Sequence, residues 1–262
     1  MKISNRVFVV TGAGNGMGRE VALGLLARGA RVAALDVNEA GLAETLRIAG
    51  AGVAATSHVV DVTDRNAVDD LVQSVLDVHG HVDALVNIAG IIHRFVPVDE
   101  LSASETARVM NVNFWGTVNT SLAFLPELKG RPEAALVNMS SLSALIPFAG
   151  QTIYGASKGA VKQFTEGLYQ ELIDTNVTVS AIFPGNISTN ISGNSGVKMI
   201  DAGGRKVRAT APEAAGASIV EGIECGRFRI LVGSDALLLD RLVRIAPKWA
   251  TGMIARQMKS VM

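Results

Sequence analysis

The sequence predicts an α/β protein built on one parallel sheet with helices on both faces. Short apolar runs alternate with segments of helical period along most of the 262 residues. The runs are continuously apolar, which is typical of strands buried on both faces, and helical crossovers require such strands to pair in parallel. A glycine-rich loop also separates the first apolar run from the first helical segment. Together these observations favour a doubly wound sheet.

Seven segments are predicted as strands: Val7–Val10, Arg31–Asp36, Val53–Val60, Ala84–Ile88, Ala134–Met139, Val177–Phe183 and Phe228–Val232. The predicted helices are Glu20–Arg28, Glu39–Ala49, Arg65–His79, Ser102–Phe124 (one long helix or two), Tyr154–Thr175 and Pro212–Glu224. Gly29, Gly50 and Gly80 end the first three helices, and Pro212 stands in a first turn, where its missing N–H does no harm. No linker-like shift of composition divides the chain, so we expect a single domain over residues 1–262. Its sheet would be Rossmann-like, with strand order 3-2-1-4-5-6-7.

Two segments fall outside this alternation. Residues 186–210 are rich in Gly, Asn and Ser and read as structureless, which predicts a substrate lid loop, with an ordinary surface loop as the alternative. Residues 234–262 form an atypical apolar C-terminal extension, whose first helix, Ser234–Ile245, has Ser234 as its candidate cap. This extension could cover the site, pack in an oligomer, lie on a membrane surface or pack within its own chain. An oligomer contact is favoured, and a membrane contact is the least favoured of the external ones.

Composition excludes several classes of protein. The chain has 24 Lys and Arg against 24 Asp and Glu, and this zero net charge argues against a nucleic-acid partner. A hydrophobic content of 48% excludes disorder for the bulk of the chain. The single cysteine, Cys225, allows no internal disulfide. Because no secretory signal core and no membrane-length apolar run is present, we expect a cytoplasmic protein.

The spacing of the histidines and of the residues around Ser141 argues against a metal site and against a hydrolase. The four histidines lack the spacing of metal ligands, so we expect no metal site. Met139–Ser143 lacks the glycines of a hydrolase nucleophile turn, which argues against Ser141 as a hydrolytic nucleophile.

The glycine-rich loop is Thr11–Gly18. Gly12 permits a tight turn, Gly16 lets the backbone approach a pyrophosphate, and Gly18 lets helix and strand pack closely. The free N–H groups of the following helix attract phosphate. The loop therefore predicts a dinucleotide site, with a packing turn that binds no ligand as the alternative.

Asp36 ends the second predicted strand, where an acid hydrogen-bonds the adenosine ribose hydroxyls in dinucleotide folds. The same carboxylate would repel a 2′-phosphate, and neither Asn15 nor Val37 supplies a cation to offset the repulsion. We therefore expect NAD rather than NADP. The alternative role for Asp36 is a cap for the helix near Asn38.

Tyr154 and Lys158 stand four residues apart, which places both side chains on one face of a helix. A phenol with a pKa near 10 needs help to act as a base, and a nearby ammonium favours the phenolate. The pair predicts a tyrosine general acid/base. A surface pair on an exposed turn is the alternative.

With Thr11-Gly12-x-x-x-Gly16-x-Gly18 and Tyr154-x-x-x-Lys158, the sequence resembles the short-chain dehydrogenase/reductases. The resemblance covers about Lys2–Val232. Ile88 replaces the second Asn of one family motif, and Ser141 stands thirteen residues before Tyr154. The other matching segments, in chain order, are Asp61-Val62, Asn87-Ile88-Ala89-Gly90, Asn113-Phe114-Trp115-Gly116, Ser140-Ser141 and Pro184-Gly185-Asn186-Ile187-Ser188-Thr189.

The resemblance implies a proton relay beside a hydride transfer. Tyr154 would exchange a proton with the substrate oxygen, and Lys158 would lower the pKa of Tyr154 and bind the nicotinamide ribose. Ser141, rather than the weaker candidate Ser140, would orient the substrate, and Asn113 would hold a water that links Lys158 to solvent. The implied cofactor-binding residues are Gly12, Asn15, Gly16, Met17, Gly18, Asp36, Asp61, Val62, Asn87, Ala89, Gly90, Tyr154, Lys158, Pro184, Gly185, Ile187 and Thr189.

The substrate pocket of such a sheet lies beyond the carboxyl ends of its strands. The segments expected there are apolar and carry no cluster of Arg or Lys for a carboxylate or phosphate. This predicts a hydrophobic or alicyclic secondary alcohol or ketone. The pocket residues that we expect are Ile92, Ser143, Leu145, Phe148 and Gln151, and further candidates are Ile91, Phe95, Ile146 and Met199.

The resemblance also implies a homotetramer or homodimer, although residues 234–262 replace the short tail that many members pack in their tetramer. Two other functions are weighed. A non-catalytic dinucleotide sensor or scaffold would have no need of Asn113, Ser141, Tyr154 and Lys158. A methyltransferase could share the glycine loop but has no role for the Tyr/Lys pair.

Overall fold

The structure is a computed structural model that describes residues 1–188, 191–197 and 209–259. Its strands pair in parallel in the order β3-β2-β1-β4-β5-β6-β7, which confirms the predicted sheet. The strands are β1 (Val7–Thr11), β2 (Arg31–Asp36), β3 (Ala55–Val59), β4 (Ala84–Asn87), β5 (Ala134–Met139), β6 (Val177–Pro184) and β7 (Arg229–Val232).

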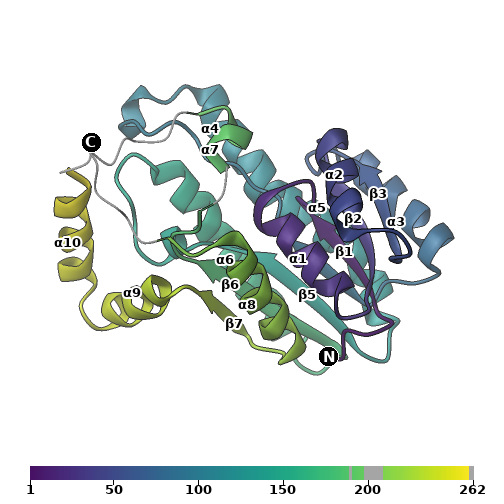
Figure 1. Ribbon diagram of the computed structural model, residues 1–262. Coiled ribbons are helices and arrows are strands. Elements are labelled where there is room, and N and C mark those ends of the chain that lie inside the picture. The colour runs from purple at the N-terminus through teal and green to yellow at the C-terminus, as the bar shows by residue number, and fades with distance from the viewer. Residues whose placement is uncertain (189–190, 198–208, 260–262) are drawn as a thin grey trace.

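The helices lie around this sheet, and the C-terminal pair extends beyond its β7 edge (Figure 1). They are α1 (Gly16–Leu26), α2 (Glu39–Ala49), α3 (Arg65–His79), α4 (Ala103–Met110), α5 (Gly116–Lys129), α6 (Thr152–Glu171), α7 (Ile191–Ser195), α8 (Pro212–Glu224), α9 (Ser234–Ile245) and α10 (Pro247–Lys259).

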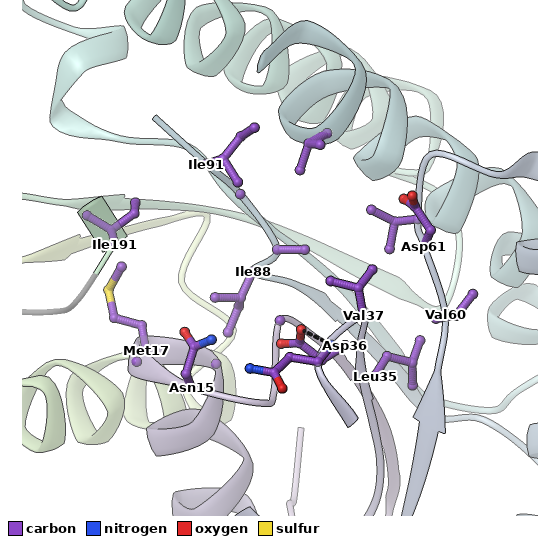
Figure 2. A pocket seen from close by; sticks show the side chains of 18 of the residues that line it. Asn15, Met17, Leu35, Asp36, Val37, Val60, Asp61, Ile88, Ile91 and Ile191 are labelled. Atoms are coloured by element: carbon purple, nitrogen blue, oxygen red, sulfur yellow. Dashed lines mark hydrogen bonds between the residues drawn. The ribbon is translucent and has the colours of Figure 1, made fainter. Parts of the chain in front are cut away.

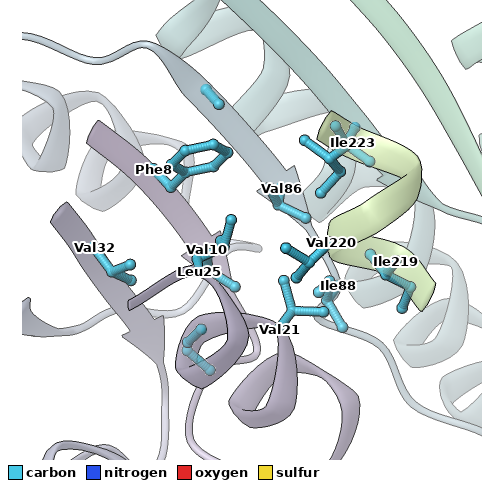
Figure 3. Packing of buried hydrophobic residues seen from close by; sticks show 14 of the residues in the cluster. Phe8, Val10, Val21, Leu25, Val32, Val86, Ile88, Ile219, Val220 and Ile223 are labelled. Atoms are coloured by element: carbon cyan, nitrogen blue, oxygen red, sulfur yellow. The ribbon is translucent and has the colours of Figure 1, made fainter. Parts of the chain in front are cut away.

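The core consists of two apolar layers, one on each face of the sheet. Helices α1, α2 and α8 pack on one face, and Figure 3 shows Val21 of α1 and Val220 of α8 in that layer. Helices α3, α5 and α6 pack on the other face. Phe8 belongs to the first layer and Val9 to the second, because successive side chains of a strand point to opposite faces. Burying each such side chain stabilises the folded state by about 1.5–3 kcal/mol relative to leaving it exposed to water.

The predicted segment Ser102–Phe124 holds two α-helices. Helix α4 ends at Met110, a π-helical turn follows at Asn111–Trp115, and α5 begins at Gly116. π-Helical turns are rare and frequently mark functional sites. This turn carries Asn113, one of the predicted catalytic residues.

Two expectations about local structure are wrong. Ser234 does not cap α9, because Gly233, with φ of 97°, is the N-cap and Ser234 is the first helical residue. Residues 186–210 are also not structureless where the structure describes them. They contain α7, and Ile187 forms a parallel bridge with Thr210. Thr189 and Met199 lie outside the described residues.

Helices α9 and α10 form a third apolar cluster with the segment that follows β5. Ala250 and Ile254 of α10 are buried together with Leu142 and Ile146. One face of the extension therefore packs within its own chain. None of the helices that the structure describes is long and apolar enough to cross a membrane.

Candidate active site

A cavity of about 380 Å³ lies at the carboxyl ends of β1, β2 and β4, where the glycine loop meets the loop after β4. In Figure 2, Val37, Val60 and Asp61 lie toward one end of it, and Met17 and Ile191 toward the other. The lining residues are Gly12, Asn15, Gly16, Met17, Gly18, Leu35, Asp36, Val37, Asn38, Val60, Asp61, Val62, Ile88, Ala89, Gly90, Ile91, Arg108, Val112 and Ile191.

The glycine loop packs too closely for side chains at two of its glycines. Gly12 has a φ of 71°, and a methyl group on it would lie 2.9 Å from the backbone of Ala89. A methyl group on Gly18 would overlap the Gly12 carbonyl. The Thr11 hydroxyl accepts hydrogen bonds from the backbone N–H groups of Ile88 (3.0 Å) and Ala89 (3.1 Å). Thr11 thus ties the loop after β1 to the loop after β4.

Both carboxylate oxygens of Asp36 accept backbone hydrogen bonds. Oδ2 accepts from the N–H of Gly14 at 2.9 Å, and Oδ1 accepts from the N–H of Asn38 at 3.0 Å. The N-cap of α2 is Asn38, whose side chain accepts from Gly41, so Asp36 is not that helix's cap. Each carboxylate oxygen of Asp36 keeps a second lone pair for a ligand hydroxyl.

Arg19 is a cation beside the glycine loop that sequence reasoning overlooked. Its Nη2 donates to the Gly14 carbonyl, and its Nε donates to the Thr45 hydroxyl at 3.0 Å. The guanidinium therefore holds the glycine loop against α2.

Ten predicted cofactor residues line the cavity: Gly12, Asn15, Gly16, Met17, Gly18, Asp36, Asp61, Val62, Ala89 and Gly90. Asn87 lies beneath it, where its side chain donates to Asn138 at 2.9 Å. Tyr154, Lys158, Pro184, Gly185 and Ile187 are not among the lining residues, and Thr189 lies outside the described residues.

Several lining residues were missed. Val37 and Val60 directly adjoin strands, a position that could have indicated them. Arg108, Val112 and Ile191 come from α4, the π-helical turn and α7. No sequence signal marks these three, because tertiary packing brings their elements to the cavity.

The Asn113 side chain clamps the loop after β4 to helix α6. Its Oδ1 accepts from the Ile91 N–H at 2.8 Å, and its Nδ2 donates to the Ile91 carbonyl and to the Ser157 hydroxyl, both at 2.9 Å. Asn113 is fully buried. Its polar side-chain atoms thus hold the backbone beside Gly90, and the water that we expected there remains a prediction.

Lys158 is buried beside Gly90, one turn along α6 from Tyr154. Its Nζ donates to the Met139 carbonyl at 3.0 Å, and a methyl group on Gly90 would lie 3.1 Å from that nitrogen. Burial lowers the pKa of Lys158 from 10.5 to about 8, because the ammonium is taken out of water. The ammonium form still predominates at pH 7.

Tyr154 is paired with Ser141 across the site. Burial raises the pKa of Tyr154, and a hydrogen bond with the Ser141 side chain lowers it. The expected effect of Lys158 on the pKa of Tyr154 therefore stays a prediction. Ser140 lies elsewhere, since its hydroxyl donates to the Lys158 carbonyl at 2.8 Å and so holds α6 against β5.

The five predicted substrate residues are not among the residues that line this cavity. Leu145 and Phe148 pack against the cluster formed with α9 and α10. Ile92 and Gln151 are buried, and the Ile92 N–H donates to the Ser195 hydroxyl of α7 at 3.0 Å. Ser143 donates its N–H to the Ser141 hydroxyl at 3.0 Å.

The Pro184–Ile187 segment is held by the C-terminal extension. The Asp235 carboxylate of α9 accepts from the Asn186 N–H at 2.7 Å, and a methyl group on Gly185 would overlap that carboxylate. Asp235 is a further residue that sequence reasoning missed.

Comparison with known proteins agrees with this architecture. A sequence model of the family described as short chain dehydrogenase matches residues 6–199. SadH of Mycobacterium tuberculosis, named only provisionally as an oxidoreductase, is 38% identical over 250 residues, which cover 92% of this chain and 90% of SadH.

Two solved structures share the fold. A short-chain dehydrogenase/reductase of Burkholderia phymatum, in complex with NAD, has a TM-score of 0.85 and 28% identity, covering 95% of this chain and 96% of its own. A short-chain dehydrogenase of Burkholderia cenocepacia, in complex with NADP, has a TM-score of 0.82 and 27% identity, covering 97% and 99%. Because the family match spans well over half of the chain, this protein belongs to the short-chain dehydrogenase family.

Proposed function

We propose that this protein is an NAD-dependent oxidoreductase that transfers a hydride between NAD(H) and a hydrophobic secondary alcohol or ketone. The observations that carry the proposal are the hydrogen bond between Tyr154 and Ser141 and the position of the Lys158 ammonium, on the same helix as Tyr154, beside Gly90 of the cavity. The oxidoreductase name of SadH and the nicotinamide cofactors of the Burkholderia structures support it.

The cavity suits a dinucleotide. Gly12 and Gly18 keep side chains out of the loop, so that backbone N–H groups at the start of α1 can meet a pyrophosphate. Val37 and Val62 provide apolar surface for an adenine. Gly90 leads toward Lys158, and Pro184–Thr189 is the segment that we propose to hold the carboxamide side of the nicotinamide.

Asp36 supports NAD over NADP. A 2′-phosphate placed against its carboxylate would bring like charges together, and Asn15 and Val37 carry no compensating charge. Arg19 is a nearby cation whose Nε and Nη2 are directed toward Thr45 and toward the Gly14 and Gly41 carbonyls.

The residues divide the chemistry as follows. A bound nicotinamide supplies the hydride acceptor or donor. During alcohol oxidation Tyr154 Oη accepts the hydroxyl proton while the Ser141 hydroxyl holds the same substrate oxygen. Lys158, protonated at neutral pH, favours the phenolate of Tyr154. Such acid–base help contributes about 10²–10⁴-fold to the rate.

The substrate side is apolar, which favours a hydrophobic or alicyclic substrate. Leu145 and Phe148 pack against the apolar cluster that Leu142 and Ile146 form with α9 and α10. Residues 186–210 would act as the lid, and α7 already contacts Ile92 through Ser195. We further propose a cytoplasmic homodimer or homotetramer whose contacts use exposed apolar side chains such as Trp115 and Leu122.

Replacing Tyr154 by Phe tests the mechanism. We expect Tyr154→Phe to lower kcat/KM for alcohol oxidation by at least about 10²-fold, because the proton acceptor is lost, while NADH binding is unchanged. The readout is NADH absorbance across a panel of hydrophobic secondary alcohols. Tyr169→Phe is the matched control, since Tyr169 is exposed and its ring lies tilted against Phe228.

Full activity of Tyr154→Phe would overturn the acid–base role. If the unaltered protein binds NADH but oxidises no member of the panel, the rival reading, a non-catalytic dinucleotide sensor, takes its place. Activity on charged sugars alone would contradict the substrate class.

A further inference from the structure

Two buried side chains near the catalytic helix carry acceptor atoms that meet no donor. His93 is 3% exposed and Gln151 is 4% exposed. His93 Nε2 and Gln151 Oε1 are both buried, and neither has a hydrogen-bond partner among the residues that the structure describes. Buried polar atoms are nearly always satisfied in folded proteins, so such a pair calls for a donor, supplied by an ordered water or by a ligand group that displaces it.

The surrounding bonds make both atoms acceptors when the His93 imidazole carries a single ring proton. Gln151 Nε2 donates to the His93 carbonyl at 2.7 Å, and the flipped amide would set oxygen against oxygen. His93 Nδ1 lies 2.7 Å from the Arg94 carbonyl, which can only accept, so the ring proton is on Nδ1. His93 Nε2 therefore presents a lone pair, as does Gln151 Oε1.

The pair lies close to Tyr154, the proposed acid/base, along the chain and in the fold. Gln151 immediately precedes α6 and stands three residues before Tyr154, about 4.5 Å along the helix axis. His93 lies in the loop after β4, whose preceding residues are held on two sides. Asn113 clamps Ile91, and Ser195 of α7 accepts from the Ile92 N–H.

We propose that His93 and Gln151 form an acceptor subsite that binds hydroxyl hydrogens of the substrate away from the reacting carbon. The inference rests on the proposed function and narrows its substrate to a neutral alicyclic alcohol or ketone that carries a further hydroxyl group. Neutral lone pairs match O–H donors, whereas they repel carboxylate and phosphate oxygens. The apolar Leu145 and Phe148 nearby fit the carbon frame of the same substrate.

Matched substrates test the subsite. Cyclohexanol and the 1,2-, 1,3- and 1,4-cyclohexanediols differ only in one hydroxyl and its position. We expect the unaltered enzyme to oxidise at least one diol with a kcat/KM roughly 10- to 100-fold above that for cyclohexanol, because a bound analogue without the hydroxyl leaves the acceptors unmet. Equal kcat/KM values for cyclohexanol and all three diols would overturn the proposal.

Two substitutions separate the subsite from a structural role of His93. In His93→Asn the side-chain amide can still donate to the Arg94 carbonyl, but nothing stands where Nε2 was. In His93→Gln the longer amide reaches the Nε2 position, but the Nδ1 donor is lost. We expect His93→Asn to reduce the diol-to-cyclohexanol ratio of kcat/KM by roughly tenfold or more, and His93→Gln to retain most of that ratio.

The opposite order, or an equal fall of cyclohexanol and diol activity in both variants, would show that His93 acts only in packing. Should the unaltered protein oxidise none of the four alcohols and no member of the panel of hydrophobic secondary alcohols, the proposed function is what fails. The subsite is then judged by binding. Diols must raise the melting temperature of the protein–NADH complex more than cyclohexanol does, and His93→Asn must abolish that difference.

Discussion

At the scale of single residues, the site concentrates buried groups whose ionisation is opposed by their surroundings. Lys158 is 3% exposed, and among the residues that the structure describes its ammonium has one hydrogen-bond partner, the Met139 carbonyl. A buried charge with a single neutral partner is unfavourable for folding, and such groups gather where function requires them. The protein should therefore have a lower free energy of unfolding with Lys158 than it would have with an apolar side chain at this position.

Replacing Lys158 by Met should remove activity and stabilise the fold. The fall in the pKa of Lys158 from 10.5 to about 8 corresponds to roughly 3 kcal/mol at pH 7. Between pH 8 and 10.5 the unfolded chain binds the extra proton, so the unaltered protein gains stability with rising pH relative to Lys158→Met. Urea denaturation at pH 7, 8.5 and 10 measures the free energy of unfolding of both proteins, and the difference between them should become smaller as the pH rises.

Lys162→Met is the control, since Lys162 is paired with Glu166 at 2.7 Å on a partly exposed surface. We expect it to change the free energy of unfolding by no more than about 1 kcal/mol. A Lys158→Met protein that is less stable at pH 7 than the unaltered one would contradict the argument.

At the scale of elements, the loop after β4 and the segment after β6 are each held by neighbours distant in sequence. The π-helical turn Asn111–Trp115 presents Asn113 to the loop after β4. Helix α7 holds the same loop through Ser195, and α9 holds the segment after β6 through Asp235. The site depends on these tethers as well as on the residues that would contact ligand.

We expect Ile254 to hold helix α10 against the segment that follows β5. We expect Ile254→Ala to lower the free energy of unfolding by about 2 kcal/mol or more, because it opens a cavity against Leu142 and Ile146. Helix α10 should also lose protection in amide hydrogen exchange. Ile245→Ala is the matched control, with a side chain 83% exposed and an expected change within about 0.5 kcal/mol.

The reverse order, with Ile245→Ala the more harmful change, would indicate that the outer face of the extension is buried in an oligomer. Size-exclusion chromatography of the two variants reports on that directly.

At the scale of the whole molecule, the strand order creates the cavity. Strand β1 pairs with β2 on one side and with β4 on the other, so the chain winds away from β1 in both directions. The loops after β1 and β4 separate there and leave a crevice at the strand ends, the position where open α/β sheets bind ligands. A ligand in this crevice bridges both halves of the sheet.

A cofactor that bridges the two halves should stabilise the entire fold. At a concentration of about 100 times its Kd, NADH should add about 2.7 kcal/mol and raise Tm by roughly 5–10 °C. NADPH at the same concentration should raise Tm less, because its 2′-phosphate meets Asp36. Differential scanning calorimetry provides the comparison, and a larger shift with NADPH would overturn the role assigned to Asp36.

Much of the fold could be predicted from local sequence patterns. Arg31–Asp36, Glu39–Ala49, Arg65–His79 and Ala134–Met139 begin and end where apolar periodicity and flanking residues predict. Two parts of the candidate site, the glycine loop and the Tyr154-x-x-x-Lys158 pair, could also be predicted from the sequence, because each motif consists of residues only a few positions apart.

The sequence by itself therefore determined the parallel sheet and the kinds of chemical groups on its carboxyl edge. Only the tertiary structure decided which groups meet there: Ser141 with Tyr154, Gln151 with the His93 carbonyl, Asp235 with Asn186, and the apolar extension with Leu142. The reason is physical. Periodicity and capping act over a few residues, whereas these contacts join segments that come together only when helices pack on the finished sheet.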